Sequence, residues 1–208
     1  MENTVLQIKD LTVAYQNNVV LQNVNLSIPS GNLVGIIGPN GAGKSTLLNA
    51  IMHLIPKIEG EVKIKGESLK TIRKLVAFIP QRDSVDWNFP ISVLDLVLMG
   101  RYVKLPWYKK ITDLDKQQAL NCLEKVNMLN FADKHISELS GGEKQRIFIA
   151  RALAQEAEVY FFDEPLVGID ATSEKEIMEI LSTMKNEGKS IFIVHHDLQS
   201  SVDYFDWV

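Results

Sequence analysis

One nine-residue segment constrains this chain more than any other part of its sequence. It reads Gly38-Pro39-Asn40-Gly41-Ala42-Gly43-Lys44-Ser45-Thr46. The spacing G-x-x-x-x-G-K-[ST] is that of a phosphate-binding loop, because its glycines let backbone N–H groups turn inward around an anion. Lys44 can reach the outer phosphates as a point charge, and the Ser45 hydroxyl is a hard oxygen ligand of the kind that Mg²⁺ prefers. The segment therefore predicts a site for a nucleoside triphosphate with Mg²⁺.

The residues around the loop support this interpretation. Residues 33–37 form an apolar run without alternation, which is typical of a strand buried on both faces. After the loop, apolar residues recur at helical spacing, so the phosphates would lie at a helix N-terminus (Leu47, Leu48, Ile51 and Met52). A chance match to the spacing is the alternative, and the flanking strand and helix argue against it.

Composition excludes several classes of protein. The chain has 208 residues and a net charge of −4, which argues against a nucleic-acid binder because such proteins usually need a basic face. Its only cysteine, Cys122, cannot form an internal disulfide, as suits a reducing cytosol, and its apolar surroundings favour a core residue. We find no N-terminal signal segment and no apolar run near the ~20 residues of a membrane span. If the protein acts at a membrane, we therefore expect it to bind there through a partner protein.

Hydrophobic patterning predicts an α/β fold. Residues 5–30 alternate as a hairpin, 60–66 alternate as a short strand, and 75–80 read as a second buried strand. From 143 onward, helices over about 143–155 and 173–186 alternate with strands over 159–163 and 190–194. Buried strands separated by helices predict a mostly parallel sheet with ligands at the carboxyl ends of its strands.

Residues 91–142 differ from the rest and predict a helical insertion. Ser92 with Asp95, and Thr112 with Asp115, have the spacing of helix-capping pairs. The second helix carries one apolar face that includes Cys122. Between the two helices, residues 101–110 read as a basic aromatic loop.

Two further polar segments fall at predicted element ends. Asp163 and Glu164 follow the apolar strand, where a carboxylate would meet Mg²⁺ and a second would orient an attacking water. The alternative is a charged loop beside a core strand. The segment Leu139-Ser140-Gly141-Gly142-Glu143 places Ser-Gly-Gly at a helix start, which predicts a second anion site. The alternative there is a simple N-cap, with Ser140 as the cap and the glycines in a turn.

With these motifs, nearly the whole chain resembles the nucleotide-binding subunit of an ABC transporter. Residues 38–46 match the Walker A loop, 159–163 the Walker B strand, and 139–143 the signature LSGGQ, with Glu143 in place of the usual Gln. The resemblance implies that Glu164 is the catalytic glutamate and that Gln81 is the Q-loop glutamine bridging Mg²⁺ and the membrane partner.

The same resemblance implies three more site residues. Asp170 lies in the D-loop, and His196, which directly precedes an aspartate, matches the switch histidine. Tyr15 stands where the family stacks an aromatic ring on adenine, and a strand-end core aromatic is the alternative. We reject a metal site at the paired histidines 195 and 196, because adjacent residues of an extended segment point to opposite faces.

The resemblance also implies a fold, a dimer and a membrane partner for the whole molecule. The fold would be a P-loop α/β core over about 1–90 and 143–208, with an N-terminal antiparallel part and a helical insertion over about 91–142. Two copies would form a head-to-tail homodimer that binds ATP and Mg²⁺ between Walker A of one and Ser140–Gly142 of the other. An integral membrane permease would hold the dimer at the cytoplasmic face, and no nucleic acid would be bound. More strand and helix would follow than the residues up to Val208 supply.

Residues 78–90 are similar to one subfamily, the ATPases of bacterial manganese, zinc or iron importers that use a solute-binding protein. Trp87 and Phe89 would be exposed anchors for the permease near residues 81–90, or else would pack inside the helical insertion. The metal would be cargo of the permease, with manganese expected first and zinc or an iron chelate as alternatives. A soluble ABC ATPase acting on DNA or the ribosome, and a small-molecule phosphotransferase, are the other classes left open.

Overall fold

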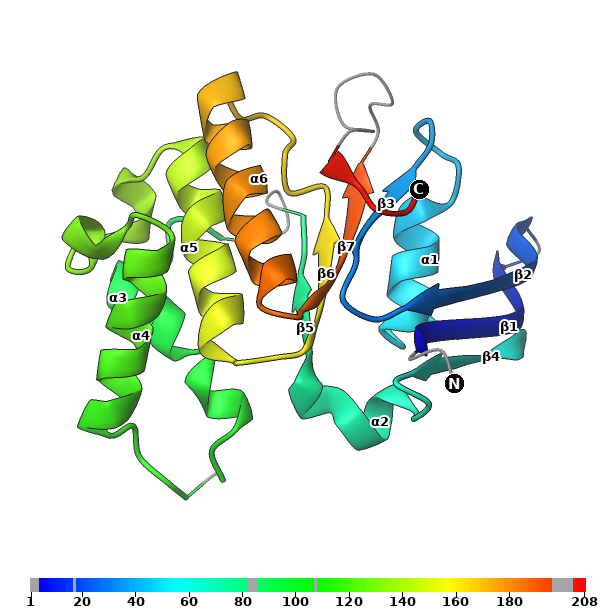
Figure 1. Cartoon of the computed structure of the whole chain (residues 1–208), viewed down its shortest axis with the longest axis horizontal. Coiled ribbons are helices and arrows are strands. Elements are labelled where there is room, and N and C mark those ends of the chain that lie inside the picture. The colour runs from blue at the N-terminus through cyan, green and yellow to red at the C-terminus, as the bar shows by residue number, and fades with distance from the viewer. Residues whose placement is uncertain (1–3, 17, 82–85, 107, 196–203) are drawn as a thin grey trace.

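The structure, a computed structural model, describes residues 4–16, 18–81, 86–106, 108–195 and 204–208. Its strands form a three-stranded antiparallel sheet of order β2-β1-β4 and a four-stranded parallel sheet of order β3-β7-β6-β5 (Figure 1). The antiparallel strands are β1 (Thr4–Tyr15), β2 (Asn18–Pro29) and β4 (Glu59–Ile64). The parallel strands are β3 (Leu33–Ile37), β5 (Val76–Ile79), β6 (Val159–Asp163) and β7 (Ser190–His195).

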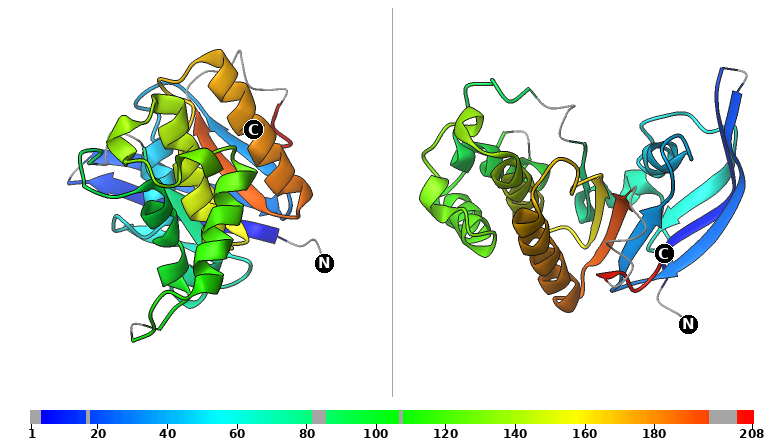
Figure 2. Two further views of the ribbon diagram at one scale, coloured as in Figure 1. Left: turned by 90° about the vertical axis from the view of Figure 1, so that its left-hand side faces the viewer. Right: turned by 90° about the horizontal axis from the view of Figure 1, so that it is seen from above.

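Helices flank the parallel sheet on both faces, as Figure 2 shows from above. The helices of the described residues are α1 (Lys44–Ile51), α2 (Leu69–Ile72), α3 (Val93–Leu98), α4 (Asp113–Lys125), α5 (Gly141–Ala154) and α6 (Ala171–Asn186), of which α3 and α4 pack on α5. Short 3₁₀ turns are η1 (Arg73–Leu75), η3 (Arg101–Val103), η4 (Leu129–Phe131) and η5 (Ile136–Glu138). The predicted α/β fold, with a parallel core sheet, an antiparallel sheet and helices, is confirmed.

Alternation along the central strands explains why both faces are covered. Phe161 of β6 and Phe192 of β7 are neighbours in register and stack with ring centroids 4.7 Å apart, on the face that packs with α1 and the antiparallel sheet. Tyr160 and Phe162 point to the opposite face, where α5 and α6 cover them. Each strand is therefore apolar throughout, as its sequence predicts.

The helical part between β5 and β6 has the predicted caps. The Ser92 hydroxyl accepts a hydrogen bond from the Asp95 N–H, 3.1 Å, and Thr112 with Asp115 closes a capping box at α4. Cys122 is buried on the inner face of α4, and burial raises the pKa of its thiol to about 11. Cys122 is therefore a core residue, as expected from its apolar surroundings.

The structure refines two sequence expectations and corrects a third. Helices α5 and α6 begin at Gly141 and Ala171, earlier than the expected 143 and 173, because Ser140 and Asp170 act as N-caps. The basic loop over 101–110 begins with a 3₁₀ turn, and the Arg101 side chain turns inward to Asp115 and Glu156. Trp87 is half-buried against Phe148 of α5, so its role as an exposed anchor is wrong, while Phe89 is exposed.

Candidate active site

The phosphate-binding loop connects β3 to α1 at the carboxyl end of the parallel sheet (Figure 1). Gly43 precedes α1 with a φ of 90°, a left-handed conformation that favours glycine. A Cβ added at Gly43 would lie 3.0 Å from the Leu21 side chain of β2, so the antiparallel sheet presses closely on the loop. The glycine therefore serves both the turn and the packing.

The Lys44 side chain is buried and folds back over the loop. Its Nζ donates to the carbonyl oxygens of Gly38, 2.8 Å, and Pro39, 3.0 Å. These two bonds hold an ammonium group at the centre of a turn of backbone amides. The positive charge therefore lies where the outer phosphates of a nucleotide would enter.

A carboxylate and a hydroxyl meet beside the loop. The Ser45 Oγ donates to Asp163 Oδ1 over 3.3 Å, which joins the start of α1 to the end of β6. Burial raises the pKa of Asp163, and the nearby charge of Glu164 raises it further, while the Ser45 hydrogen bond opposes both. A half-buried carboxylate in this setting gains stability from a cation, and Ser45 and Asp163 are hard oxygen ligands. These residues therefore fit a Mg²⁺ ion.

Glu164 follows β6 in an unusual backbone conformation. Its φ is 52°, rare for a residue with a side chain, and its N–H donates to the Val194 carbonyl over 3.2 Å. Its Oε2 accepts a hydrogen bond from Gln81 Nε2, 3.1 Å, so side chains that follow β5 and β6 converge. Non-glycine residues in such conformations cluster at functional sites, which supports Glu164 as a site residue.

A hollow of about 190 Å³ lies at this end of the sheet. It is lined by Val20, Asn40, Gly41, Gly43, Lys44, Ser45, Thr46 and Glu164. The structure thus brings together the loop and Glu164 from widely separated segments. Val20 was not expected from the sequence, since it is an ordinary strand residue with no motif around it.

The Ser-Gly-Gly segment lies elsewhere in the chain, at the start of α5 on the other face of the sheet (Figure 2). Ser140 is exposed, its N–H donates to Glu143 Oε2 over 2.7 Å, and its hydroxyl accepts from the Glu143 N–H over 3.4 Å. Asp170 caps α6 by accepting from the Thr172 N–H, 3.1 Å, and the Ser173 N–H, 3.0 Å. Neither Ser140 nor Asp170 lines the hollow at the phosphate loop.

Tyr15 was expected to contact adenine and His196 to contact the γ-phosphate, and the structure describes only the first of them. Tyr15 is 47% exposed at the end of β1, so the alternative of a core aromatic is wrong and its ring is available to a ligand. His196 lies outside the described residues, so its expected position stays a prediction. Its neighbour His195 is buried at the end of β7.

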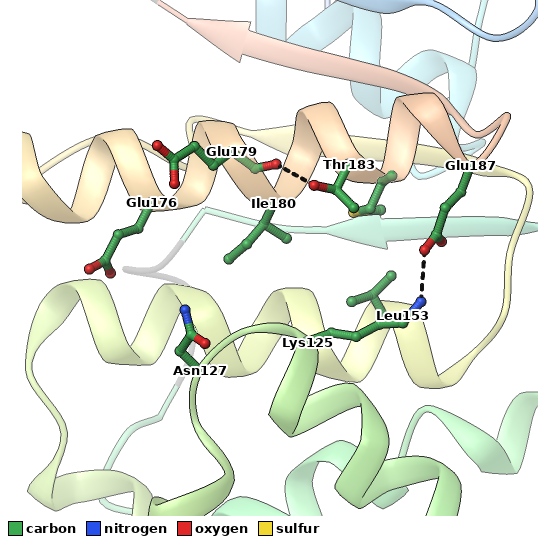
Figure 3. Close-up of a pocket in the computed structure, with 9 residues that line it drawn as sticks. Lys125, Asn127, Leu153, Glu176, Glu179, Ile180, Thr183 and Glu187 are labelled. Atoms are coloured by element: carbon green, nitrogen blue, oxygen red, sulfur yellow. Dashed lines mark hydrogen bonds and ion pairs between the residues drawn. The ribbon is translucent and has the colours of Figure 1, made fainter.

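A second hollow, between α5 and α6, holds none of the expected site residues (Figure 3). Leu153 and Ile180 lie in it, and Lys125 at its edge pairs with Glu187 over 3.0 Å. Its lining shares no residue with the hollow at the phosphate-binding loop, so it is separate from the candidate active site.

Comparison with known proteins agrees with this geometry. The family model described as "ABC transporter" matches residues 21–167. The chain belongs to the ABC transporter family. This membership implies that the chain binds ATP and is an ATPase coupled to transport. No helix in the described part of the chain is both long and apolar enough to cross a bilayer.

Three relatives in the ABC transporter family are about half identical to this chain. The manganese transport system ATP-binding protein MntB of Bacillus subtilis (strain 168) is 49% identical over 98% of this chain and 81% of its own length. MntB of Listeria monocytogenes serovar 1/2a is 51% identical over 97% and 84%. The zinc transport system ATP-binding protein TroB of Treponema pallidum (strain Nichols) is 50% identical over 98% and 76%.

Solved structures in the family share the fold. A dimeric ATP-binding cassette in a post-hydrolysis state, bound to ADP and Pi, has a TM-score of 0.83 and 29% identity, covering 98% of this chain and 94% of that one. An inward-facing transporter described as of the metal-chelate type has a TM-score of 0.83 and 29% identity, covering 94% and 74%. The likeness extends over both sheets and the helices between them.

Proposed function

We propose that this chain is the ATP-hydrolysing subunit of a bacterial ABC importer for manganese or a related divalent metal. The observation that carries the proposal is near 50% identity, over almost the entire chain, to ATP-binding proteins of manganese and zinc transport systems. Zinc and iron chelates are the alternative cargoes. The catalytic core comprises about 1–90 and 143–208, and the helical insertion about 91–142.

The geometry at the carboxyl end of the sheet supports a division of roles. Loop amides and Lys44 bind the phosphates of ATP, and Tyr15 stacks on adenine. Mg²⁺, held by Ser45, Asp163 and Gln81, would supply positive charge to the phosphates.

Glu164 acts on the attacking water. It orients the water toward the γ-phosphorus and accepts its proton, the bond from that phosphorus to the bridging oxygen breaks, and ADP and phosphate leave. The Gln81 amide, 3.1 Å from the Glu164 carboxylate, fixes the orientation of that base. His196 donates a hydrogen bond to a γ-phosphate oxygen.

A second copy of the chain completes the site. Ser140, Gly142 and Asp170 do not line their own chain's phosphate hollow, yet Ser140 is exposed at a helix start that attracts anions. A head-to-tail homodimer places this start over the partner's γ-phosphate, and the similar dimeric cassette supports such an arrangement. Closure around ATP excludes water, which strengthens each electrostatic contact.

The permease contacts a second face of the molecule. A hollow of about 580 Å³ is lined by Leu54, Phe78 and Val103 together with basic residues such as Arg73. Phe89 does not line this hollow, but it is exposed and lies within the expected contact segment 81–90. Through this contact the dimer stays at the cytoplasmic face, and the solute-binding protein is linked to it only by way of the permease.

The transported metal is cargo of the permease in this proposal. In the part of the chain that the structure describes, no three His, Cys, Asp or Glu side chains are grouped as a metal site. In this proposal the ATPase responds to the metal through the permease.

Two substitutions test the proposed function. Glu164→Gln removes the base and should reduce phosphate release by about 100-fold or more, while ATP traps a stable dimer visible by size exclusion. Lys44→Ala should weaken ATP binding, because the phosphates lose a buried ammonium partner. Normal turnover of Glu164→Gln, or phosphate transferred to an acceptor in place of water, contradicts the proposal.

Reconstitution identifies the cargo. The dimer with its permease in vesicles should take up manganese in an ATP-dependent way, and the Glu164→Gln complex serves as the inactive control. Uptake of zinc or an iron chelate in preference to manganese would select the alternative.

A further inference from the structure

The starts of α5 and α6 touch at one point. A Cβ added at Gly142 would lie 2.3 Å from Ser173 Oγ and 2.7 Å from Ser173 Cβ. Both distances are far below van der Waals contact, so only glycine allows this approach. Gly142, the second glycine of the Ser-Gly-Gly segment, therefore packs directly against the first turn of α6.

The Ser173 hydroxyl also fixes the residue that begins α6. Its Oγ donates to Asp170 Oδ2 over 2.8 Å, while Asp170 Oδ1 accepts from the Ser173 N–H over 3.0 Å. Hydrogen bonds from Ser173 thereby hold the pKa of Asp170 below its ordinary value. One side chain thus contacts Gly142 on α5 and Asp170 before α6.

A second contact joins the same two helices further along. Arg146 of α5 and Glu176 of α6 form an ion pair. The Arg146 side chain is only 14% exposed, so this pair is well shielded on the α5 side. With contacts at both levels, the two helix starts are held in one relative position.

We infer that Ser173 is a positioning residue that makes Asp170 and the Ser140–Gly142 segment one unit for contact with the partner copy. The inference rests on the proposed function, in which both elements face the partner's nucleotide. Contact made at Asp170 then places Ser140 and Gly141 for the same closure. Losing the Ser173 hydroxyl leaves both helices and the Arg146–Glu176 ion pair in place, and it removes the hydrogen bond that ties Asp170 to the contact at Gly142.

The test uses ATP-dependent dimer formation in a Glu164→Gln background, followed by size exclusion. Adding Ser173→Ala should raise the ATP concentration for half-maximal dimer about tenfold, because the two segments, no longer linked, must then be ordered when the copies meet. Ser173→Thr retains the hydroxyl and should restore the original concentration. Ser182→Ala makes the same change at an exposed position of α6 and is the matched control.

Two further measurements separate positioning from folding. The affinity of the single Ser173→Ala chain for ADP, which binds at the phosphate-binding loop and Tyr15, should match that of the original chain, and the variant should unfold cooperatively with only a small decrease in Tm. If Ser173→Ala dimerises like Ser182→Ala, the inference is wrong and the proposed function stands. If Glu164→Gln alone forms no dimer with ATP, the proposed function fails and the inference fails with it.

Discussion

Arg101 lies outside the sequence motifs, and its side chain links three segments of the helical part. Its Nε donates to Asp115 Oδ1 over 3.0 Å, and its guanidinium also pairs with Glu156 at 3.2 Å. Burial lowers the pKa of Arg101, but hydrogen bonds to the two carboxylates outweigh that effect and raise it. The Thr112 side-chain hydrogen bond is the main reason that the pKa of Asp115 lies below its ordinary value.

Asp115→Asn should destabilise the fold by about 2 kcal/mol at pH 7, because it weakens a charged hydrogen bond and the cap of α4. The folded pKa of Asp115 is lowered, so its contribution is fully present above the unfolded value and is lost as pH falls through the folded one. Urea unfolding of both proteins at pH 7, 5 and 3 should therefore show the difference shrinking only below about pH 4. A constant difference at all three pH values would contradict this electrostatic origin.

Around Asp115, the sequence predicted one contact and missed another. The cap between Thr112 and Asp115 was predictable, because its partners are three residues apart and follow a known pattern. The bond from Arg101 to Asp115 spans 14 residues and follows no pattern, so the sequence identified the basic loop but not this inward contact. Likewise, Lys44 and Glu164 were found by motif, whereas the packing of Trp87 on Phe148 depends on tertiary contact.

At the level of whole elements, the helix N-termini show how far the sequence predicts the structure. The pairs at Ser92 and Thr112 predicted α3 and α4 correctly, and Ser-Gly-Gly was expected at a helix start, with Ser140 as its cap in the alternative. Gly141 and Gly142 in the first turn of α5 have poor helix propensity, so the helical pattern itself was read only from about 143. The structure shows that the Ser140–Glu143 capping box overrides that propensity.

Close packing between elements makes Gly100→Ala a sharp test. A Cβ at Gly100 would lie 2.1 Å from the Arg151 carbonyl oxygen, a backbone atom of α5 that cannot turn away. The end of α3 must then separate from α5, at a cost of about 3 kcal/mol in unfolding free energy. Met99→Ala is the neighbouring control, because its side chain is 47% exposed. Equal stability of the two variants by urea unfolding would show that the contact relaxes freely.

For the whole molecule, the sequence predicted the classes of layer but not their order. Buried runs identified the parallel strands, and alternation identified the hairpin. The order β3-β7-β6-β5, and the pairing of β4 with β1, depend on contacts between distant segments that no local pattern encodes. The 580 Å³ hollow has the same origin, since its walls come from the residues after α1, from α2, η1, β5 and η3, and from the residue after α5.

That hollow yields a prediction for the assembled transporter. Leu54 lines it and is 59% exposed, whereas Leu114, at the start of α4, is 69% exposed and lies outside it. Leu54→Asp puts a charge into an apolar contact, so copurification with the permease should fall at least tenfold relative to Leu114→Asp. ADP affinity should be the same for both variants, because neither side chain lines the phosphate hollow. Equal copurification of the two would move the permease contact away from this face and toward the surface around Phe89.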